Sequence, residues 1–217
     1  MSDIYEVMSI LRAVRRLKPD PVPHDVLQRV LQAAAWAPTG GNVQPFRIVA
    51  VTASEQKQAI QKLYDEEWAK YTTWHRKAIP GMEEPQKSAT EKMVRAGDYL
   101  AANMHTTPVI LVFCFNPDNM AITDSDLGRP SVVGGGSVYT AVQNVMLACV
   151  EEGLGCVLTT LLCYREAEVK AILNIPDNWY TCAHVPIGYP VLKGHGPINR
   201  RPVDKLVYAN SWGEAWS

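Results

Sequence analysis

Arginines gather at two places far apart in this chain of 217 residues. Arg12, Arg15 and Arg16 lie near the amino end, and Arg200 and Arg201 lie near the carboxyl end. A guanidinium group carries several N–H donors in one plane, so it binds phosphate oxygens in pairs. Guanidinium groups from two distant segments can converge on one dianionic phosphate. The two clusters therefore indicate a phosphate-binding site.

Between these clusters lies a loop, residues 37–46, with the sequence Ala-Pro-Thr-Gly-Gly-Asn-Val-Gln-Pro-Phe. Glycine has no side chain, so a Gly-Gly pair lets the backbone come close to a flat polar ring. A phosphate site and a ring site together describe a nucleotide-like cofactor. Neither the dinucleotide pattern G-x-G-x-x-G nor the phosphate loop G-x-x-x-x-G-K-[ST] is present.

These features, together with others in a fixed order, resemble the FMN-dependent nitroreductase superfamily. The resemblance covers nearly the whole chain. Its carriers are residues 12–16 followed by 18–23, the loop 37–46, and segments 153–155, 158–161, 186–190 and 200–202. It implies non-covalently bound FMN and an intertwined homodimer whose flavin sites are built from both subunits.

The resemblance also assigns roles to residues. The FMN phosphate is expected to be bound by Arg12, Arg16, Arg200 and Arg201, while Arg15 is expected to bind either the phosphate or the pyrimidine edge of the flavin. The remaining expected cofactor contacts are Ala13, Pro38, Thr39, Gly40, Asn42, Gln44 and Ser137, with backbone at Thr159, Thr160 and Leu161.

The implied reaction is a ping-pong transfer of hydride. NADH or NADPH gives hydride to flavin N5, and a nitroaromatic, quinone or activated alkene then takes it. The flavin carries this chemistry, so no catalytic side chain is expected. We also find no G-x-S-x-G elbow for hydrolysis.

The chain departs from the family at two places. Many members have Arg-Arg-Ser where this chain has Leu11-Arg12-Ala13, and well-studied members have Pro-x-Glu-Gly where residues 160–163 read Thr-Leu-Leu-Cys. Phosphate contacts are then expected to shift onto the remaining arginines, and nicotinamide recognition stays open.

Three alternatives remain: a flavin-cleaving enzyme, a reductive dehalogenase and a non-catalytic flavin-binding protein. The dehalogenases carry a Glu-Tyr-Lys lid whose spacing Glu67, Tyr71 and Lys92 imitate, but Lys92 lies too far upstream of the strand that begins at Pro108. Trp68, Tyr71 and Trp74, in the charged segment 65–95, form either a substrate lid or one face of an ordinary amphipathic helix.

Hydrophobic periodicity predicts helices at 3–16, 24–36, 54–76, 88–105, 138–152 and 165–173, and strands at 46–51, 108–115, 156–160 and 180–188. In the first helix, residues 12, 15 and 16 would share one face. Ser54 is the expected N-cap of the third helix. The helix at 138–152 is apolar around much of its circumference, so it must be buried, within the chain or against another subunit. The whole chain, 1–217, is predicted to be one α+β domain with a mixed central sheet packed between helices.

The composition of the chain bears on which binding partners it can have and where it is located. A formal net charge of −1 favours neither nucleic acid nor an anionic membrane. The amino terminus lacks the pattern of a signal peptide, and no apolar run reaches the roughly 18 residues of a membrane span, so a cytoplasmic location is expected. The five cysteines and five histidines show no zinc or disulfide spacing, so no metal site is predicted.

Overall fold

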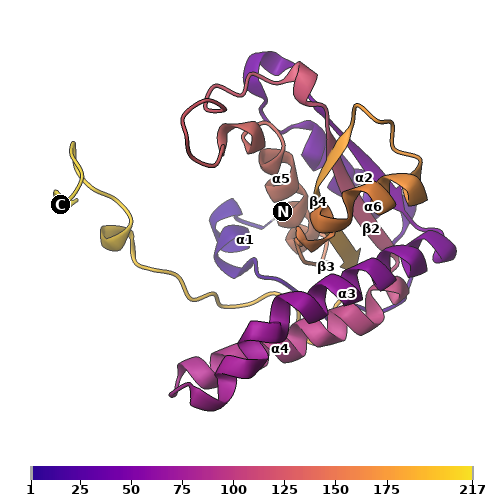
Figure 1. The fold of residues 1–217 in the computed structure, drawn as a ribbon, viewed down its shortest axis with the longest axis horizontal. Coiled ribbons are helices and arrows are strands. Elements are labelled where there is room, and N and C mark those ends of the chain that lie inside the picture. Colours follow the sequence, from indigo (N-terminus) through magenta and orange to yellow (C-terminus); the bar gives the residue numbers. More distant parts are fainter. Residues whose placement is uncertain (1, 217) are drawn as a thin grey trace.

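One sheet of four strands forms the centre of the protein, of which a computed structural model describes residues 2–216. The strands are β1 (Phe46–Val51), β2 (Val109–Phe115), β3 (Gly155–Cys156) and β4 (Tyr180–Gly188), in the order β1-β2-β4-β3 (Figure 1). The α+β class is confirmed. All three strand pairings are antiparallel, so the sheet is antiparallel where we expected a mixed one.

Two helices between β1 and β2 explain why these strands are antiparallel. After β1 the chain runs out along α3 (Ser54–Ala78) and back along α4 (Gln86–Asn103), as Figure 1 shows. It therefore returns to the end of the sheet that it left, and Val51 pairs with Ile110. A single crossover helix would have delivered β2 from the opposite end, as in a parallel pair.

The sheet lies between two layers of helices, as predicted. Successive residues of a strand point to opposite faces. Leu111 belongs to the core that contains α2 (His24–Ala35) and α5 (Tyr139–Glu151). Val112 belongs to the core that contains α3, α4 and α6 (Glu166–Leu173). Both residues are fully buried, as expected of a strand that is covered on both faces.

The first helix is shorter than predicted. Helix α1 spans only Ile4–Ile10, and the chain turns extended at Leu11. Beyond it, the Val14 N–H donates to the Cys156 carbonyl at 2.8 Å and the Lys18 N–H donates to the Tyr189 carbonyl at 2.7 Å. These bonds to distant backbone replace the helical ones. The expectation that Arg12, Arg15 and Arg16 share one helical face is therefore wrong.

The extended segment still turns its arginines outward. Leu11, Val14 and Leu17 are buried at every third position, which leaves Arg12 and Arg16 exposed and Arg15 half-buried. Gly155 permits this packing, because a Cβ there would lie 2.7 Å from both Leu17 Cδ2 and Val14 Cγ1.

Helix α5 is buried against its own chain along one side, at Ala141, Val142, Val145 and Cys149. It ends at Gly153, whose φ of 69° is left-handed. The Gly153 N–H donates to the Val150 carbonyl and the Leu154 N–H donates to the Cys149 carbonyl, which is the Schellman arrangement. The glycine predicted to end this helix is confirmed.

Other boundaries shift by a few residues. The N-cap of α3 is Ala53, not Ser54, and no side chain caps that end. The predicted strand 156–160 is reduced to β3 and an isolated bridge between Thr159 and His184. Beyond β4 the chain leaves the body as an extended carboxyl-terminal arm (Figure 1). Within residues 2–216, no helix is both long and apolar enough to cross a membrane.

Candidate functional site

Two adjoining cavities contain the amino-terminal arginines and the segment 157–161. The first, here called the basic cavity, measures about 620 Å³ and is lined by residues 12–16, one face of α4 and residues 192–194. The second, here called the inner cavity, measures about 200 Å³ and is lined by residues 157–161 and the aromatic side of α3. Arg15 lines both, so it connects them.

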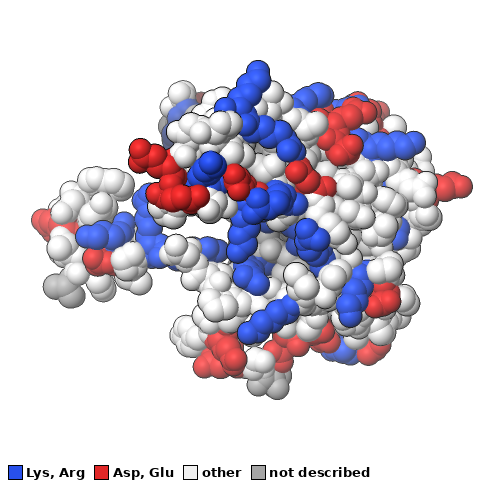
Figure 2. All heavy atoms as spheres, turned by 90° about the horizontal axis from the view of Figure 1, so that it is seen from below, with Lys and Arg blue, Asp and Glu red and all other residues white. Residues whose placement is uncertain are grey.

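The basic cavity is strongly positive. Its lining includes the cations Arg12, Arg15, Arg16, Lys92 and Lys193, and none of the described residues that line it is acidic. Figure 2 shows basic side chains gathered around a hollow near the middle of the molecule. A cavity with this charge attracts anions, and phosphate groups above all.

Two of these arginines are held in place. Arg12 donates from Nε and Nη2 to the Gly194 carbonyl at 3.1 and 2.8 Å, which ties the segment 192–194 to the arginine segment. The guanidinium of Arg16 lies 4.3 Å from the centre of the Tyr99 ring, on α4. Three elements distant in sequence therefore share the walls of one cavity.

Backbone forms one wall of the inner cavity. Thr159 exchanges backbone hydrogen bonds with His184 of β4, both at 2.9 Å, and the Leu161 N–H donates to Thr159 Oγ1 at 3.4 Å. The N–H of Thr160, an exposed residue, makes no hydrogen bond within the described part of the chain. It is free to donate to a polar ring atom placed in the cavity.

Tyr64 lines the inner cavity and is buried. Burial raises the pKa of its phenol, while a hydrogen bond with Thr159 and the nearby charge of Arg15 act in the opposite direction. The phenol therefore stays protonated at neutral pH.

An ion cluster fixes the segment that follows Leu161. Arg165 pairs with Glu66 and Glu67 of α3 and with Glu168 of α6, the last at 2.7 Å. Glu67 also pairs with Lys70 at 2.6 Å, and its side chain is buried. These ion pairs attach α3 to the loop that forms the backbone wall. They also occupy Glu67, so this residue is not available as part of a Glu-Tyr-Lys lid.

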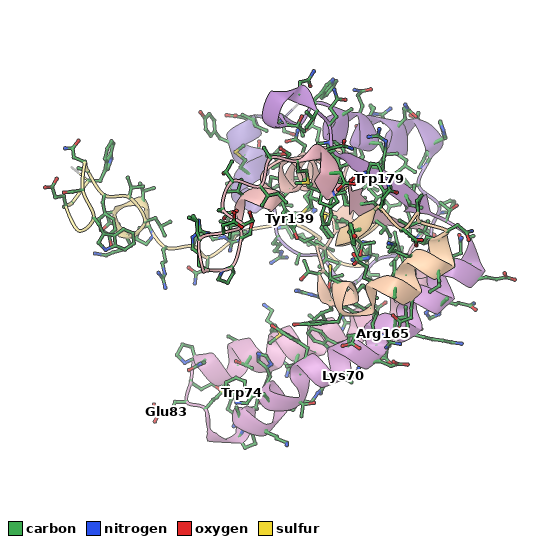
Figure 3. All side chains as sticks on the ribbon, turned by 45° about the horizontal axis from the view of Figure 1, so that its top comes forward. Lys70, Trp74, Glu83, Tyr139, Arg165 and Trp179 are labelled. Carbon is green, nitrogen blue, oxygen red and sulfur yellow. The ribbon has the colours of Figure 1, made fainter. Side chains whose placement is uncertain are left out.

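The aromatic residues of segment 65–95 differ in position. Trp68 is only 6% exposed and lines the inner cavity, with its Nε1 donating to Asp98 at 2.8 Å. Tyr71 also lines the cavity and is 50% exposed. Trp74 is 67% exposed and lies toward the protruding end of the α3–α4 hairpin (Figure 3). Trp68 is thus a wall, and Tyr71 has the exposure that a lid residue needs.

The Gly-Gly loop forms a separate group of candidates. The Gly40 N–H donates to Ser137 Oγ at 3.0 Å, the Gln44 N–H donates to Thr39 Oγ1 at 3.1 Å, and Gln44 Nε2 donates to Asn42 Oδ1 at 3.1 Å. Gly41, Asn42 and Gln44 have φ of 56°, 55° and 47°. The loop therefore holds an unusual backbone shape through its own polar residues and Ser137.

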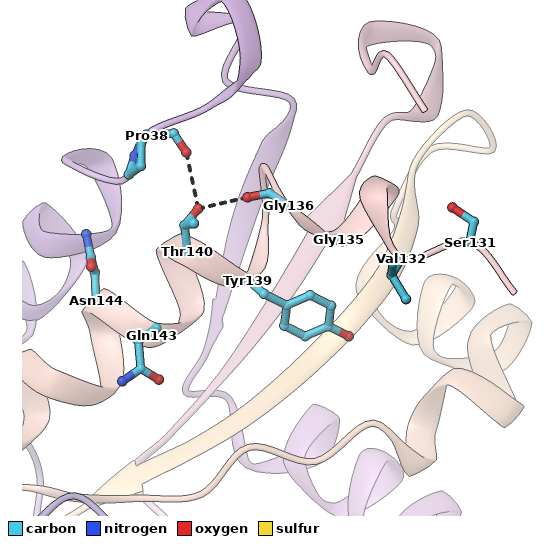
Figure 4. Close-up of a pocket in the computed structure, with 9 residues that line it drawn as sticks. All are labelled: Pro38, Ser131, Val132, Gly135, Gly136, Tyr139, Thr140, Gln143 and Asn144. Atoms are coloured by element: carbon cyan, nitrogen blue, oxygen red, sulfur yellow. Dashed lines mark hydrogen bonds between the residues drawn. The ribbon is translucent and has the colours of Figure 1, made fainter. Parts of the chain in front are cut away.

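Pro38 lines a third cavity of about 830 Å³, here called the α5 cavity, beside the amino end of α5. Figure 4 shows the Thr140 hydroxyl donating to the Pro38 carbonyl and to the Gly136 carbonyl. Tyr139 also lines this cavity and is 40% exposed. No residue of the arginine segment is among those that line it.

Arg200 and Arg201 lie on the carboxyl-terminal arm. Both are exposed, and within the described part of the chain the Arg200 side chain makes one hydrogen bond, from Nη1 to the neighbouring Asn199 carbonyl at 2.9 Å. The chain therefore brings Arg12, Ala13, Arg15, Arg16 and 159–161 together, and it leaves the Gly-Gly loop and the arm apart from them. Sequence reasoning missed Lys193. It also did not assign Lys92 to a phosphate site. The signal that could have placed Lys92 there is the helical spacing of residues 89, 92, 93 and 96, which puts them on one face of α4.

Comparison with known proteins relates this chain to one family of enzymes. The model of the Nitroreductase family matches residues 12–189. A NADH dehydrogenase of Thermus thermophilus is 24% identical over an alignment 222 positions long, which covers 90% of each chain. Iodotyrosine deiodinase 1 of Rattus norvegicus is 24% identical over 209 residues, covering 94% of this chain and 68% of the relative. In fold, the chain is similar to the NADPH:FMN oxidoreductase of Vibrio harveyi complexed with NAD+, with TM-score 0.66, 21% identity, and 98% and 79% of the two chains covered.

Proposed function

Because the chain belongs to the nitroreductase family, we propose that it is an NAD(P)H-dependent oxidoreductase that binds FMN and reduces a small-molecule acceptor. The observation that carries this proposal is the junction at Arg15, where a cavity lined by cations meets a cavity lined by backbone and aromatic side chains. The similarity to a NADH dehydrogenase and the fold of an NADPH:FMN oxidoreductase support it.

The donors of the two cavities fit the chemistry of FMN. A terminal phosphate needs cationic donors, and Arg12 and Arg16 supply them, with no carboxylate of the described lining to compete. A flavin ring needs backbone N–H groups along its polar edge, and the Thr160 N–H is free for this role. Arg15, between the two, would lie beside the ring, where positive charge stabilises the anionic reduced flavin.

FMN supplies two-electron transfer between a nicotinamide donor and an oxidised acceptor such as a nitroaromatic, a quinone or an activated alkene. The protein then has to bind, orient and exclude water. Tyr64 and Trp68 form a buried wall, and Tyr71 is exposed enough to cover a planar substrate. Donor and acceptor would use the same side of the inner cavity in turn, which gives ping-pong kinetics.

We further propose that the protein is a homodimer in which each site is shared. One chain presents its candidates in separate groups, and a second copy would bring the Gly-Gly loop or the arm of one subunit to the basic and inner cavities of the other. The arm carries exposed apolar residues, among them Val203, Leu206 and Trp212, which is 91% exposed. Exposed apolar residues on an extended segment indicate a surface that is covered by a partner.

Reductive dehalogenation is the second candidate, because iodotyrosine deiodinases are among the relatives. Tyr71 and Lys92, two of the three residues whose spacing imitates the lid of such enzymes, line adjoining cavities. Glu67, which would be the glutamate of a Glu-Tyr-Lys lid, is buried and paired with Lys70 and Arg165. This pairing favours the NAD(P)H oxidoreductase.

The test is direct. The purified protein should be yellow, heat should release FMN identified by its mass, and NADH or NADPH should bleach the flavin in a stopped-flow experiment. A bound FAD would contradict the cofactor assignment. If neither NADH nor NADPH reduces the bound flavin, the proposed function is refuted, and the protein is a flavin-binding protein without oxidoreductase activity.

A further inference from the structure

The basic cavity contains more positive charge than one FMN phosphate requires. A dianionic phosphate is neutralised by two cations, and the cavity presents five: Arg12, Arg15, Arg16, Lys92 and Lys193. Arg12 and Arg16 are held by Gly194 and Tyr99 at positions along the extended segment. Lys92 and Lys193 come from two other elements and form no ion pair within the described part of the chain.

Acidic residues near the cavity do not neutralise these lysines. Glu91, the neighbour of Lys92, pairs with Arg95 at 3.3 Å. Asp98, further along α4, accepts from Arg76 and from Trp68 Nε1. Both carboxylates thus have other partners, and the charges of Lys92 and Lys193 are left to act on an anion in the cavity.

The rest of the lining suits a purine. Ala89, Met93 and Ala96 lie on one face of α4, and Leu192 lies on the opposite loop, so small and flexible apolar side chains alternate with the cations. Methionine adapts its shape to a flat aromatic ring and makes favourable sulfur contacts with it. The cavity therefore combines an apolar surface with phosphate-binding cations, which is the chemistry of an adenosine phosphate.

We infer that Lys92 and Lys193 bind the 2′-phosphate of the nicotinamide donor and make this protein select NADPH over NADH. The inference rests on the proposed function, since it concerns the donor of the same site. NADPH differs from NADH only in that phosphate. A nicotinamide in the inner cavity leaves the adenosine end of the same molecule free to enter the adjoining basic cavity, which shares Arg15 with it.

The binding test uses the FMN-loaded protein and two probes, adenosine 2′,5′-bisphosphate and 5′-AMP, titrated by calorimetry. The bisphosphate should bind more tightly, and its advantage should shrink at high salt because both lysines are near the surface. In turnover, kcat/KM should favour NADPH, with the difference mainly in KM.

Variants identify the residues responsible. Lys92→Ala and Lys193→Ala should each lower the NADPH preference by about threefold to fivefold, since an exposed ion pair contributes up to about 1 kcal/mol. The double variant should lower it by about tenfold or more. Lys62→Ala is the matched control, because Lys62 is an exposed lysine of α3 that lines neither cavity. It should leave the preference unchanged.

Each contrary outcome has a distinct meaning. Equal binding of the two probes, or a preference for NADH, would overturn the inference while the proposed function stands. A double variant that loses FMN affinity in an apo-protein titration, with an unchanged donor preference, would also overturn it and would assign both lysines to the FMN phosphate. A protein that retains no FMN and oxidises neither donor would fail the proposed function itself.

Discussion

The indole of Trp68, which lines the inner cavity, packs directly against Gly97 of α4. A Cβ built there would lie 1.9 Å from Trp68 Cζ2 and 2.2 Å from Cη2. Real atoms do not approach so closely, so in Gly97→Ala either the indole must move or the helices must separate. The indole is fixed by its hydrogen bond from Nε1 to Asp98 and by burial, so it cannot move freely.

The cost follows from these contacts. Overpacking a buried site costs about 1–3 kcal/mol, and loss of the Trp68 hydrogen bond costs about 0.5–1.5 kcal/mol. Alanine regains about 1 kcal/mol over glycine in a helix. The variant should therefore be destabilised by about 0.5–3.5 kcal/mol, and near the middle of that range the Tm should fall by about 4–8 °C for a domain of this size.

The assay is thermal and urea unfolding with a double-mutant cycle. Trp68→Phe shortens the ring that clashes, so Gly97→Ala should cost less in a Trp68→Phe background than in the wild type, with a coupling of about 1 kcal/mol or more. Gly81→Ala is the control, because a Cβ there meets nothing within 4 Å and should change little. A Gly97→Ala protein as stable as the wild type, with no coupling to Trp68, would refute this account of the wall.

Three further predictions concern the ligand, the pH dependence and the arm. Arg200→Ala should leave the free protein's stability unchanged, because its only described bond is to Asn199, but should weaken FMN binding about tenfold to a hundredfold. Riboflavin should bind both proteins equally, and an equal loss for both ligands would exclude phosphate recognition. Burial lowers the pKa of His184 to about 4, so the unfolded state binds a proton first as the pH falls. Between pH 6.5 and 4 the wild type should lose about 1.4 kcal/mol of stability per pH unit relative to His184→Leu, and parallel urea-denaturation profiles would contradict this. Removal of residues 203–217 should yield a monomer with little bound FMN in sedimentation. A truncated protein that is still a dimer and retains FMN would show that the arm is needed for neither dimerisation nor FMN binding.

Much of the fold could be predicted from the sequence because its helices and strands carry strong hydrophobic periods. Helices α2, α3, α4, α5 and α6 and strands β1, β2 and β4 lie within a few residues of their predicted bounds. The end of α1 could not be predicted in this way. The spacing of residues 12, 15 and 16 fits a helix. The backbone bonds of Val14 with Cys156 and of Lys18 with Tyr189, each to a residue more than 140 positions away, decide the conformation instead.

The candidate site was harder to predict for the same reason. Motif order identified the arginine segment and 159–161, and the structure brings these together around Arg15. Motif order gave no sign that Arg165 would attach α3 to the backbone wall, because Glu66 and Glu67 resemble ordinary surface charge in the sequence. Nor could it identify Lys193, since a single lysine after a strand has no recognisable pattern. Such residues become visible only when their partners are known.

The neutral, buried His184 connects the sheet to the backbone wall. Neither ring nitrogen has a hydrogen-bond partner within the described part of the chain, and an unpaired polar group in a core carries a free-energy cost. Its backbone, however, holds Thr159 through two hydrogen bonds, and the Thr159 side chain accepts from the Leu161 N–H. A rigid strand thus fixes Thr159 and Leu161 while Thr160, between them, keeps a free N–H. The proposed flavin site needs this combination, because the donor must be fixed in position and still unpaired before the ring binds.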